Sequence, residues 1–201
     1  PEDLVAPALT GGYVFKRDRL GSGDVAIWNG SAAGEYGFTT PIVPVDPETS
    51  GLATQQVAYL GEALDDMANA LAAVDGIDPR TGLHYEQLLD VDSFIDHHIL
   101  NLFVKNPDAF RLSGYFHKDR EGPIHAGPIW DLDRTMASRD SRARYPTWWD
   151  AKNQTSDCTP IFSYGWYEGL FEWPEFRERY WAQFSWLLEN ELSAENVNSW
   201  L

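Results

Sequence analysis

Apolar residues recur at helical spacing in several stretches of the chain. The longest stretch is 53–74, where apolar positions return every three or four residues: Val57, Leu60, Leu64, Met67, Ala68 and Leu71. This period places them on one face of an α-helix. The same criterion predicts a helix from about 92 to 104, one that begins after Pro174, and one over 194–201.

Shorter apolar stretches between turn residues predict strands. Residues 11–16 form a candidate strand that starts at a Gly-Gly pair, and the prolines within 42–47 favour extended backbone. Residues 115–117 and 124–129 flank the turn Lys-Asp-Arg-Glu-Gly, which is the pattern of a β-hairpin. The sequence therefore predicts an α+β domain that is mainly helical.

Composition and charge limit the classes of function. The 201 residues are 43% hydrophobic, which is typical of one globular domain. The formal net charge of −16 argues against binding to nucleic acid or to an anionic membrane, because both need a basic face. No apolar run is long enough to cross a bilayer. The single cysteine, Cys158, excludes an internal disulfide.

Three aspartates mark a candidate site for phosphate chemistry. Asp108 lies just beyond an Asn-Pro pair that should stop the second helix, and Asp131 and Asp133 follow the predicted hairpin. Because a hairpin returns the chain close to its start, we expect Asp131 to lie near Asp108. Converging carboxylates repel one another unless a cation neutralises them, and Mg²⁺ accepts one or two carboxylates with water and phosphate oxygens. A nearby carboxylate can then align a hydroxyl group for phosphoryl transfer.

Several of these polar residues also have a structural interpretation. Aspartates in loops often turn the chain, and Asp-x-Asp is a weak motif by itself. His97 and His98 are adjacent on a helix and point about 100° apart, so they cannot easily share a metal ion and are predicted to be structural. A basic run after the aspartates is either a solvated loop or a contact to phosphate or an acidic substrate; it comprises Arg134, Arg139, Arg142 and Arg144.

Four segments, in order along the chain, resemble one protein family. They are the Gly-Gly-Tyr strand at 9–19, the Pro-rich entry and helix at 43–71, the stretch 90–133 that ends in Trp-Asp-Leu-Asp, and the Pro-x-Phe helix at 170–184. Together they make the chain similar to the CotH kinases, atypical protein kinases related to spore coat protein H. The order of the four segments makes the resemblance specific.

The resemblance implies a fold, a reaction and roles for particular residues. It implies an atypical protein-kinase C-lobe-like fold with a short β-hairpin at the active site. The implied reaction transfers the γ-phosphate of ATP to Ser or Thr of a protein, expected to be basic and Ser-rich, with Mg²⁺ or Mn²⁺. Asp108 matches the catalytic aspartate, and Asp131 and Asp133 match the metal-binding motif. Ser113 stands where some relatives offer Asn to a second metal, and its hydroxyl is a weaker, neutral ligand.

The nucleotide-contacting part of such a kinase is not recognisable in this sequence. Neither a G-x-G-x-x-G loop nor a Walker motif occurs, and Lys16 follows a strand without either loop. The resemblance places that N-lobe before Pro1. Residues 1–201 are therefore expected to be the C-terminal part of the kinase domain and to transfer little phosphate alone.

Two other functions would use the same features. A non-catalytic binding module would suit the acidic, tryptophan-rich composition and the extracellular, cell-surface or spore-surface location that the resemblance implies. A metal-dependent phosphodiester hydrolase would use the same aspartates as metal ligands. The presence of Asp108 and Asp131 favours catalysis, whereas Ser113 favours binding.

Overall fold

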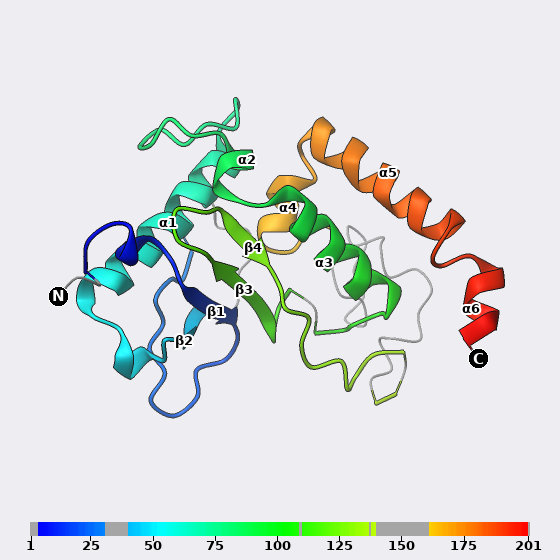
Figure 1. Ribbon diagram of the computed structural model, residues 1–201, viewed down its shortest axis with the longest axis horizontal. Coiled ribbons are helices and arrows are strands. Elements are labelled where there is room, and N and C mark those ends of the chain that lie inside the picture. Colours follow the sequence, from blue (N-terminus) through cyan, green and yellow to red (C-terminus); the bar gives the residue numbers. More distant parts are fainter. Residues whose placement is uncertain (1–3, 31–39, 109, 137, 140–160, 201) are drawn as a thin grey trace.

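The protein combines six α-helices with a small antiparallel sheet within the described residues (Figure 1). The computed structural model describes residues 4–30, 40–108, 110–136, 138–139 and 161–200. The strands are β1 (Tyr13–Arg17), β2 (Ile42–Asp46), β3 (Gly114–Lys118) and β4 (Ile124–Ala126). The helices are α1 (Thr54–Ala72), α2 (Tyr85–Leu88), α3 (Val91–Phe103), α4 (Trp166–Leu170), α5 (Pro174–Glu189) and α6 (Ala194–Trp200). The predicted α+β class is confirmed.

The sheet has the strand order β2-β1-β3-β4, and each neighbouring pair is antiparallel. Side chains alternate along a strand, so every second residue of β1 faces the core: Tyr13, Phe15 and Arg17 are all buried. Phe15 lies opposite Phe116 of β3, and their rings stack with centroids 5.8 Å apart. The predicted hairpin is thus β3–β4, and β1 extends it into a sheet.

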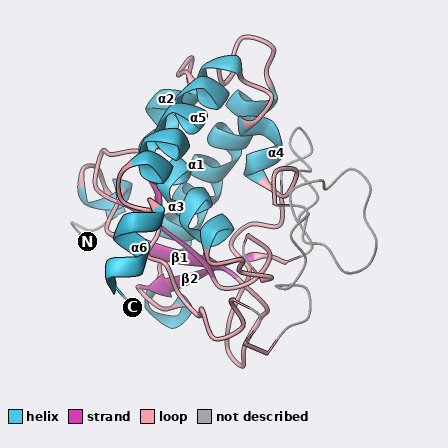
Figure 2. Cartoon of the chain, turned by 90° about the vertical axis from the view of Figure 1, so that its right-hand side faces the viewer, coloured by secondary structure: helices cyan, strands magenta, loops and turns pink. Residues whose placement is uncertain are grey.

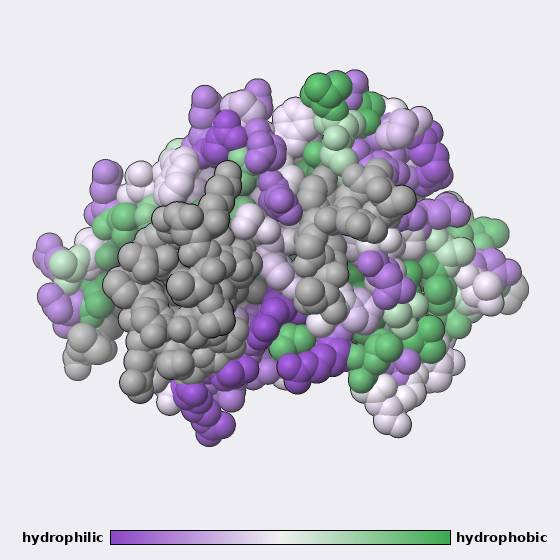
Figure 3. Space-filling view, turned by 180° about the vertical axis from the view of Figure 1, so that it is seen from behind, coloured by the Kyte–Doolittle hydropathy of each residue, from purple (hydrophilic) through white to green (hydrophobic). Residues whose placement is uncertain are grey.

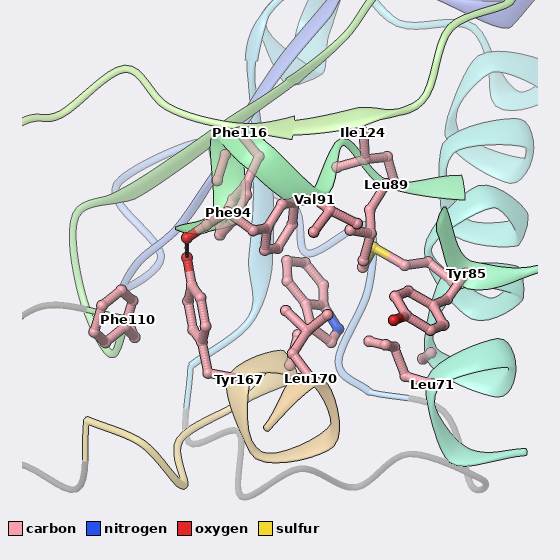
Figure 4. Packing of buried hydrophobic residues seen from close by; sticks show 14 of the residues in the cluster. Leu71, Tyr85, Leu89, Val91, Phe94, Phe110, Phe116, Ile124, Tyr167 and Leu170 are labelled. Carbon is pink, nitrogen blue, oxygen red and sulfur yellow. Dashed lines mark hydrogen bonds between the residues drawn. The ribbon is translucent and has the colours of Figure 1, made fainter. Parts of the chain in front are cut away.

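Helices α1, α3 and α4 supply the other side of the core. Phe94 of α3 packs on Phe116 of β3, and Phe116 meets Trp166 of α4 edge-on at 5.0 Å between centroids. Figure 4 shows Phe94 and Phe116 beside the sheet, on the side that faces Tyr167 and Leu170 of α4. In Figure 2 most of the helical layer lies on one side of the strands. Burial of these large rings is the main stabilising contribution to this layered arrangement.

Helix α3 connects the hairpin to the loop that carries Asp108. Its N-cap is Asp90, whose Oδ1 accepts a hydrogen bond from the Ser93 amide at 2.7 Å. The Asp90 amide donates to the Ile124 carbonyl, and the Ser93 hydroxyl accepts from the Ala126 amide, so the start of α3 is tied to β4. Helix α3 ends at Phe103, and the chain then continues into the loop that contains Asp108.

The described helices include none that is both long and apolar enough to span a bilayer, as the sequence predicts. The longest, α1, has 19 residues and carries Asp and Glu side chains along its length. Three residues considered above lie outside the described residues: Arg142, Arg144 and Cys158.

The segment before β1 packs against the turn of the β3–β4 hairpin. The Gly12 amide donates to the Lys118 carbonyl at 2.8 Å, and the Glu121 amide donates to the Thr10 hydroxyl at 3.0 Å. A Cβ atom placed on Gly11 would lie 2.1 Å from the backbone carbonyl carbon of Asp119. Gly11 is therefore required by a close backbone approach, and Gly12 is favoured by its left-handed backbone, with φ of 81°.

We expect Gly11→Ala to destabilise the fold by about 1–3 kcal/mol, because the added methyl group meets main chain that cannot move aside as a side chain could. Urea denaturation of the two proteins measures the difference. Gly51→Ala is the matched control, since its Cβ would meet Pro47 at an ordinary 3.6 Å. Equal, small losses in both variants would show that the hairpin turn adapts to the methyl group.

Candidate functional site

The Asp108 loop is held against the end of α3 by two asparagines. The buried Asn106 side chain donates to Asn101 Oδ1 at 2.9 Å and accepts from the Asp108 amide at 3.1 Å. Asn101 in turn donates to the His97 carbonyl one helical turn earlier, at 2.8 Å. This chain of hydrogen bonds fixes the backbone of Asp108 relative to α3.

Arg17, on β1, holds the chain on the other side of Asp108. Its Nη1 donates to the Phe110 carbonyl at 2.6 Å, and its Nε donates to the Thr40 hydroxyl at 3.2 Å. Thr40 donates onward to the Arg111 carbonyl at 2.6 Å. The Asp108 loop is thus bracketed by α3 and β1.

Arg17 is buried, and its guanidinium lies 4.7 Å from the centre of the Tyr164 ring. Burial lowers the pKa of Arg17 to about 9, so the group remains charged at neutral pH. Sequence reasoning missed this residue. The signal was present, because a period of two places Arg17 on the same inward face as Tyr13 and Phe15.

The Asp108 carboxylate is clamped by two arginines. Its Oδ1 accepts from Arg111 Nη2 at 2.6 Å and its Oδ2 from Arg134 Nη1 at 2.7 Å. The Asp108 side chain is 13% exposed, so these charge-assisted bonds are screened less than surface pairs. Arg134 comes three residues after Asp131. The pair therefore brings the Trp-Asp-Leu-Asp segment beside the Asp108 loop.

A second contact joins the same two segments. The Ser113 hydroxyl donates to Asp131 Oδ2 at 3.3 Å. Both residues have left-handed backbone, with φ of 53° for Ser113 and 59° for Asp131. Left-handed backbone is unfavourable for residues other than glycine, and such strain clusters at functional sites. The hairpin thus brings Asp131 back to the start of β3, close to the Asp108 loop.

Asp133 points to a different partner. It is exposed, and its Oδ2 lies 3.5 Å from Arg139 Nη1. In the part of the chain that the structure describes, no three Asp, Glu, His or Cys side chains converge as metal ligands. The expected cluster of three carboxylates is thus not assembled in this arrangement. Arginines neutralise the carboxylates of Asp108 and Asp133. The Asp131 carboxylate is exposed to solvent and accepts a hydrogen bond from the Ser113 hydroxyl.

A comparison with models of protein families matches residues 43–200, more than half of the chain, to the family described as CotH kinase protein. The chain belongs to the CotH kinase protein family. The matched region begins in β2 and ends in α6, so it includes the Asp108 loop and the Trp-Asp-Leu-Asp segment. Comparisons with curated proteins and with solved structures found no match.

Beneath the Asp108 loop of this CotH kinase protein lies a buried pair of histidines. His98 Nε2 is 3.0 Å from the Ile161 carbonyl, and its Nδ1 is 2.9 Å from the Tyr180 hydroxyl. A carbonyl only accepts, so Nε2 carries the hydrogen and Nδ1 accepts from Tyr180. Phe110, two residues after Asp108, stacks on the His98 ring with centroids 5.0 Å apart.

His97 makes a separate set of bonds. The Tyr167 hydroxyl donates to the Phe94 carbonyl at 3.0 Å, so His97 Nδ1, 3.2 Å from the same oxygen, is the donor there. Burial lowers the pKa of His97 to about 4 and that of His98 to about 3. The structural interpretation of both histidines is thus supported. They lie in the core itself, supporting α3, and each is neutral at physiological pH.

Proposed function

We propose that this CotH kinase protein transfers the γ-phosphate of ATP to a Ser or Thr hydroxyl of a protein, with Mg²⁺ or Mn²⁺. One observation carries the proposal. Two loops that are distant in sequence adjoin, because Arg134 binds Asp108 and Ser113 binds Asp131. One aspartate to orient an acceptor hydroxyl and another to hold a metal are two of the protein groups that kinase chemistry requires.

Asp131 fits a hydrated metal ion. Its carboxylate is exposed and has the Ser113 hydroxyl 3.3 Å away, so a cation there would keep open positions for water and phosphate oxygens. Mg²⁺ prefers such a site to a cage made only of protein ligands. When bound with ATP, the metal would neutralise charge on the phosphates. Asp133, also exposed, would join as a ligand by leaving Arg139.

Asp108 would accept and orient the acceptor hydroxyl. Each of its oxygens already accepts from an arginine, and the departure of one arginine would give the hydroxyl direct access to the carboxylate. Arg134 is the group that exchanges, because its side chain is 41% exposed and lies on the segment after Asp131. Its guanidinium would then donate to phosphate oxygens, for which its geometry is suited. Arg111, three residues from Asp108, would stay bound to the carboxylate.

The overall architecture and charge support the same proposal. Helix α3, the Asp108 loop and the β3–β4 hairpin follow one another in the order expected of a kinase C-lobe-like domain. The net charge of −16 would attract a cationic protein. Figure 3 shows hydrophilic side chains along the upper edge and at the lower centre of one face. A basic, Ser-rich protein is therefore the proposed acceptor class.

A non-catalytic binding module is the second candidate. It is favoured by the two ion pairs of Asp108, which occupy both carboxylate oxygens. It is also favoured by the absence of three converging metal ligands among the described residues. A protein of this kind would bind its partner equally well with and without metal and nucleotide.

We expect Mg²⁺ or Mn²⁺ with ATP to raise the melting temperature of the protein, and Asp131→Asn to remove most of that rise. Differential scanning fluorimetry across a metal titration measures the effect. Ser113→Asn should strengthen it, because an amide oxygen is a better ligand than a hydroxyl. Asp119→Asn, at the opposite end of the same hairpin, is the control and should keep the full rise. An undiminished rise in Asp131→Asn would place the ion elsewhere and support the second candidate.

A further inference from the structure

A second candidate site lies at the far end of the β3–β4 hairpin from Asp131. It is a cavity of about 230 Å³ between α1, the segment around α2 and the hairpin turn. Its apolar wall includes Ala63, Leu88 and Ile124. Neither Asp108 nor Asp131 lines it, so the cavity is separate from the site proposed for phosphate transfer.

The residues that line this cavity include Lys118, whose side chain is nearly buried. Lys118 is 7% exposed, and its Nζ donates to the Gly122 carbonyl at 2.6 Å. The Nζ also lies 5.6 Å from the centre of the Tyr59 ring. Among the described residues no carboxylate lies within 4.0 Å of Nζ. An ammonium has three donors, so two remain for a ligand.

The cavity also contains a charged pair, Asp66 and Arg80, whose charges already neutralise each other. Asp66, which is buried, accepts two hydrogen bonds from Arg80, one of them from Nε at 2.7 Å. This bidentate pair neutralises both groups. Among the described residues that line the cavity, Lys118 is therefore the buried charged group with no oppositely charged side chain within 4.0 Å.

Exposed carboxylates stand at the edge of the same cavity. The Glu62 side chain is 62% exposed and has only a long contact, 3.9 Å, to Arg80 Nη1. Glu121 follows the hairpin strand and is also exposed. A ligand that carried only negative charge would be repelled by these groups, and one that carried only positive charge would be repelled by Lys118.

We propose that this cavity binds a small zwitterion with a short apolar body, the chemistry of a free apolar amino acid. The ligand carboxylate meets Lys118 Nζ, its ammonium meets Glu62 or Glu121 at the edge, and its side chain lies against Leu88 and Ile124. The cavity volume suits a molecule of this size. Burial lowers the pKa of Lys118, and a bound carboxylate would restore it.

The test is a calorimetric titration of the 201-residue protein with L-leucine, L-valine and L-methionine. We expect saturable binding of at least one of them. The amide of that amino acid, which lacks the carboxylate, and its N-acetyl form, which lacks the ammonium, should each bind about tenfold more weakly or worse. These ligand changes leave the protein unaltered, so the result does not depend on how a variant folds.

Lys118→Met removes the ammonium and keeps the apolar stem, and it should weaken amino-acid binding by at least about tenfold. Lys16→Met, on β1 and outside the cavity, should leave binding unchanged. No saturable binding up to about 10 mM overturns the proposal. So does equal binding to the Lys118→Met variant. Equal binding of the N-acetyl form would instead identify a site for a peptide's C-terminal carboxylate, and the zwitterion proposal would fail.

Discussion

Replacing Asp108 by asparagine is expected to lower phosphate transfer by about a thousandfold, the effect of losing a positioned carboxylate that accepts the acceptor proton. The amide still accepts a hydrogen bond but cannot take up a proton. The measurement is transfer of label from γ-labelled ATP to a basic, Ser-rich acceptor, with Mg²⁺ and with Mn²⁺, by the full-length natural protein that contains residues 1–201. The folded state should lose little, about 1–2 kcal/mol, because one arginine can still bind the amide oxygen.

Asp92→Asn is the matched control for this experiment. Asp92 also binds an arginine, with its Oδ1 2.7 Å from Arg179 Nη2, but it lies at the start of α3 and far along the helix from Asp108. Transfer by this variant should equal that of the parent. If Asp108→Asn transfers phosphate as well as its parent, Asp108 does not have the catalytic role. If the parent itself transfers none with either metal, the binding module becomes the better hypothesis.

Acidification from pH 7 to pH 4 is expected to remove about 3 kcal/mol of stability through His97 alone, and more through His98. The pKa of each ring is lowered by burial, from 6.5 to about 4 for His97 and to about 3 for His98. The unfolded chain therefore binds protons below pH 6.5 that the folded chain does not. The stability is fully present above about pH 6.5 and is lost as the pH falls through this window.

Urea denaturation at a series of pH values measures this loss. His97→Asn should flatten the pH dependence, since the asparagine Nδ2 can still donate to the Tyr167 hydroxyl but does not titrate. His117→Asn serves as the control, because that ring is only partly buried on β3 and stacks on His125. A pH dependence that His117→Asn flattens and His97→Asn leaves intact would contradict the assignment.

Local features of the sequence predicted the elements that carry the site. The apolar period over 53–74 indicated α1, which spans Thr54–Ala72, and the turn residues at 118–122 indicated the β3–β4 hairpin. Helix ends were predicted less well, since α3 begins at Val91 and its predicted start was about residue 92. Asp90 caps α3, and Gln56 closes the first turn of α1 by accepting from the Ala53 amide. Cap choice depends on competing side chains within one turn, which periodicity does not resolve.

The aromatic residues show where local pattern is insufficient. Trp166 is buried between α4 and the sheet, whereas Trp181 and Trp186 on α5 are about half exposed. All three are large apolar rings in helices, so composition alone does not separate them. Their burial differs because α4 packs into the core, whereas the later part of α5 contacts little of the core.

The sequence by itself determined the α+β class, the helix-loop-hairpin order and the candidate aspartates, because periodicity and turn chemistry act over a few residues. Only the tertiary structure decided how charges pair. It places Asp108 between Arg111 and Arg134, pairs Asp133 with Arg139, and buries Arg17 beneath the Asp108 loop. Partner choice and burial depend on residues far apart in sequence, and local patterns carry no information about which of several arginines will reach a given carboxylate.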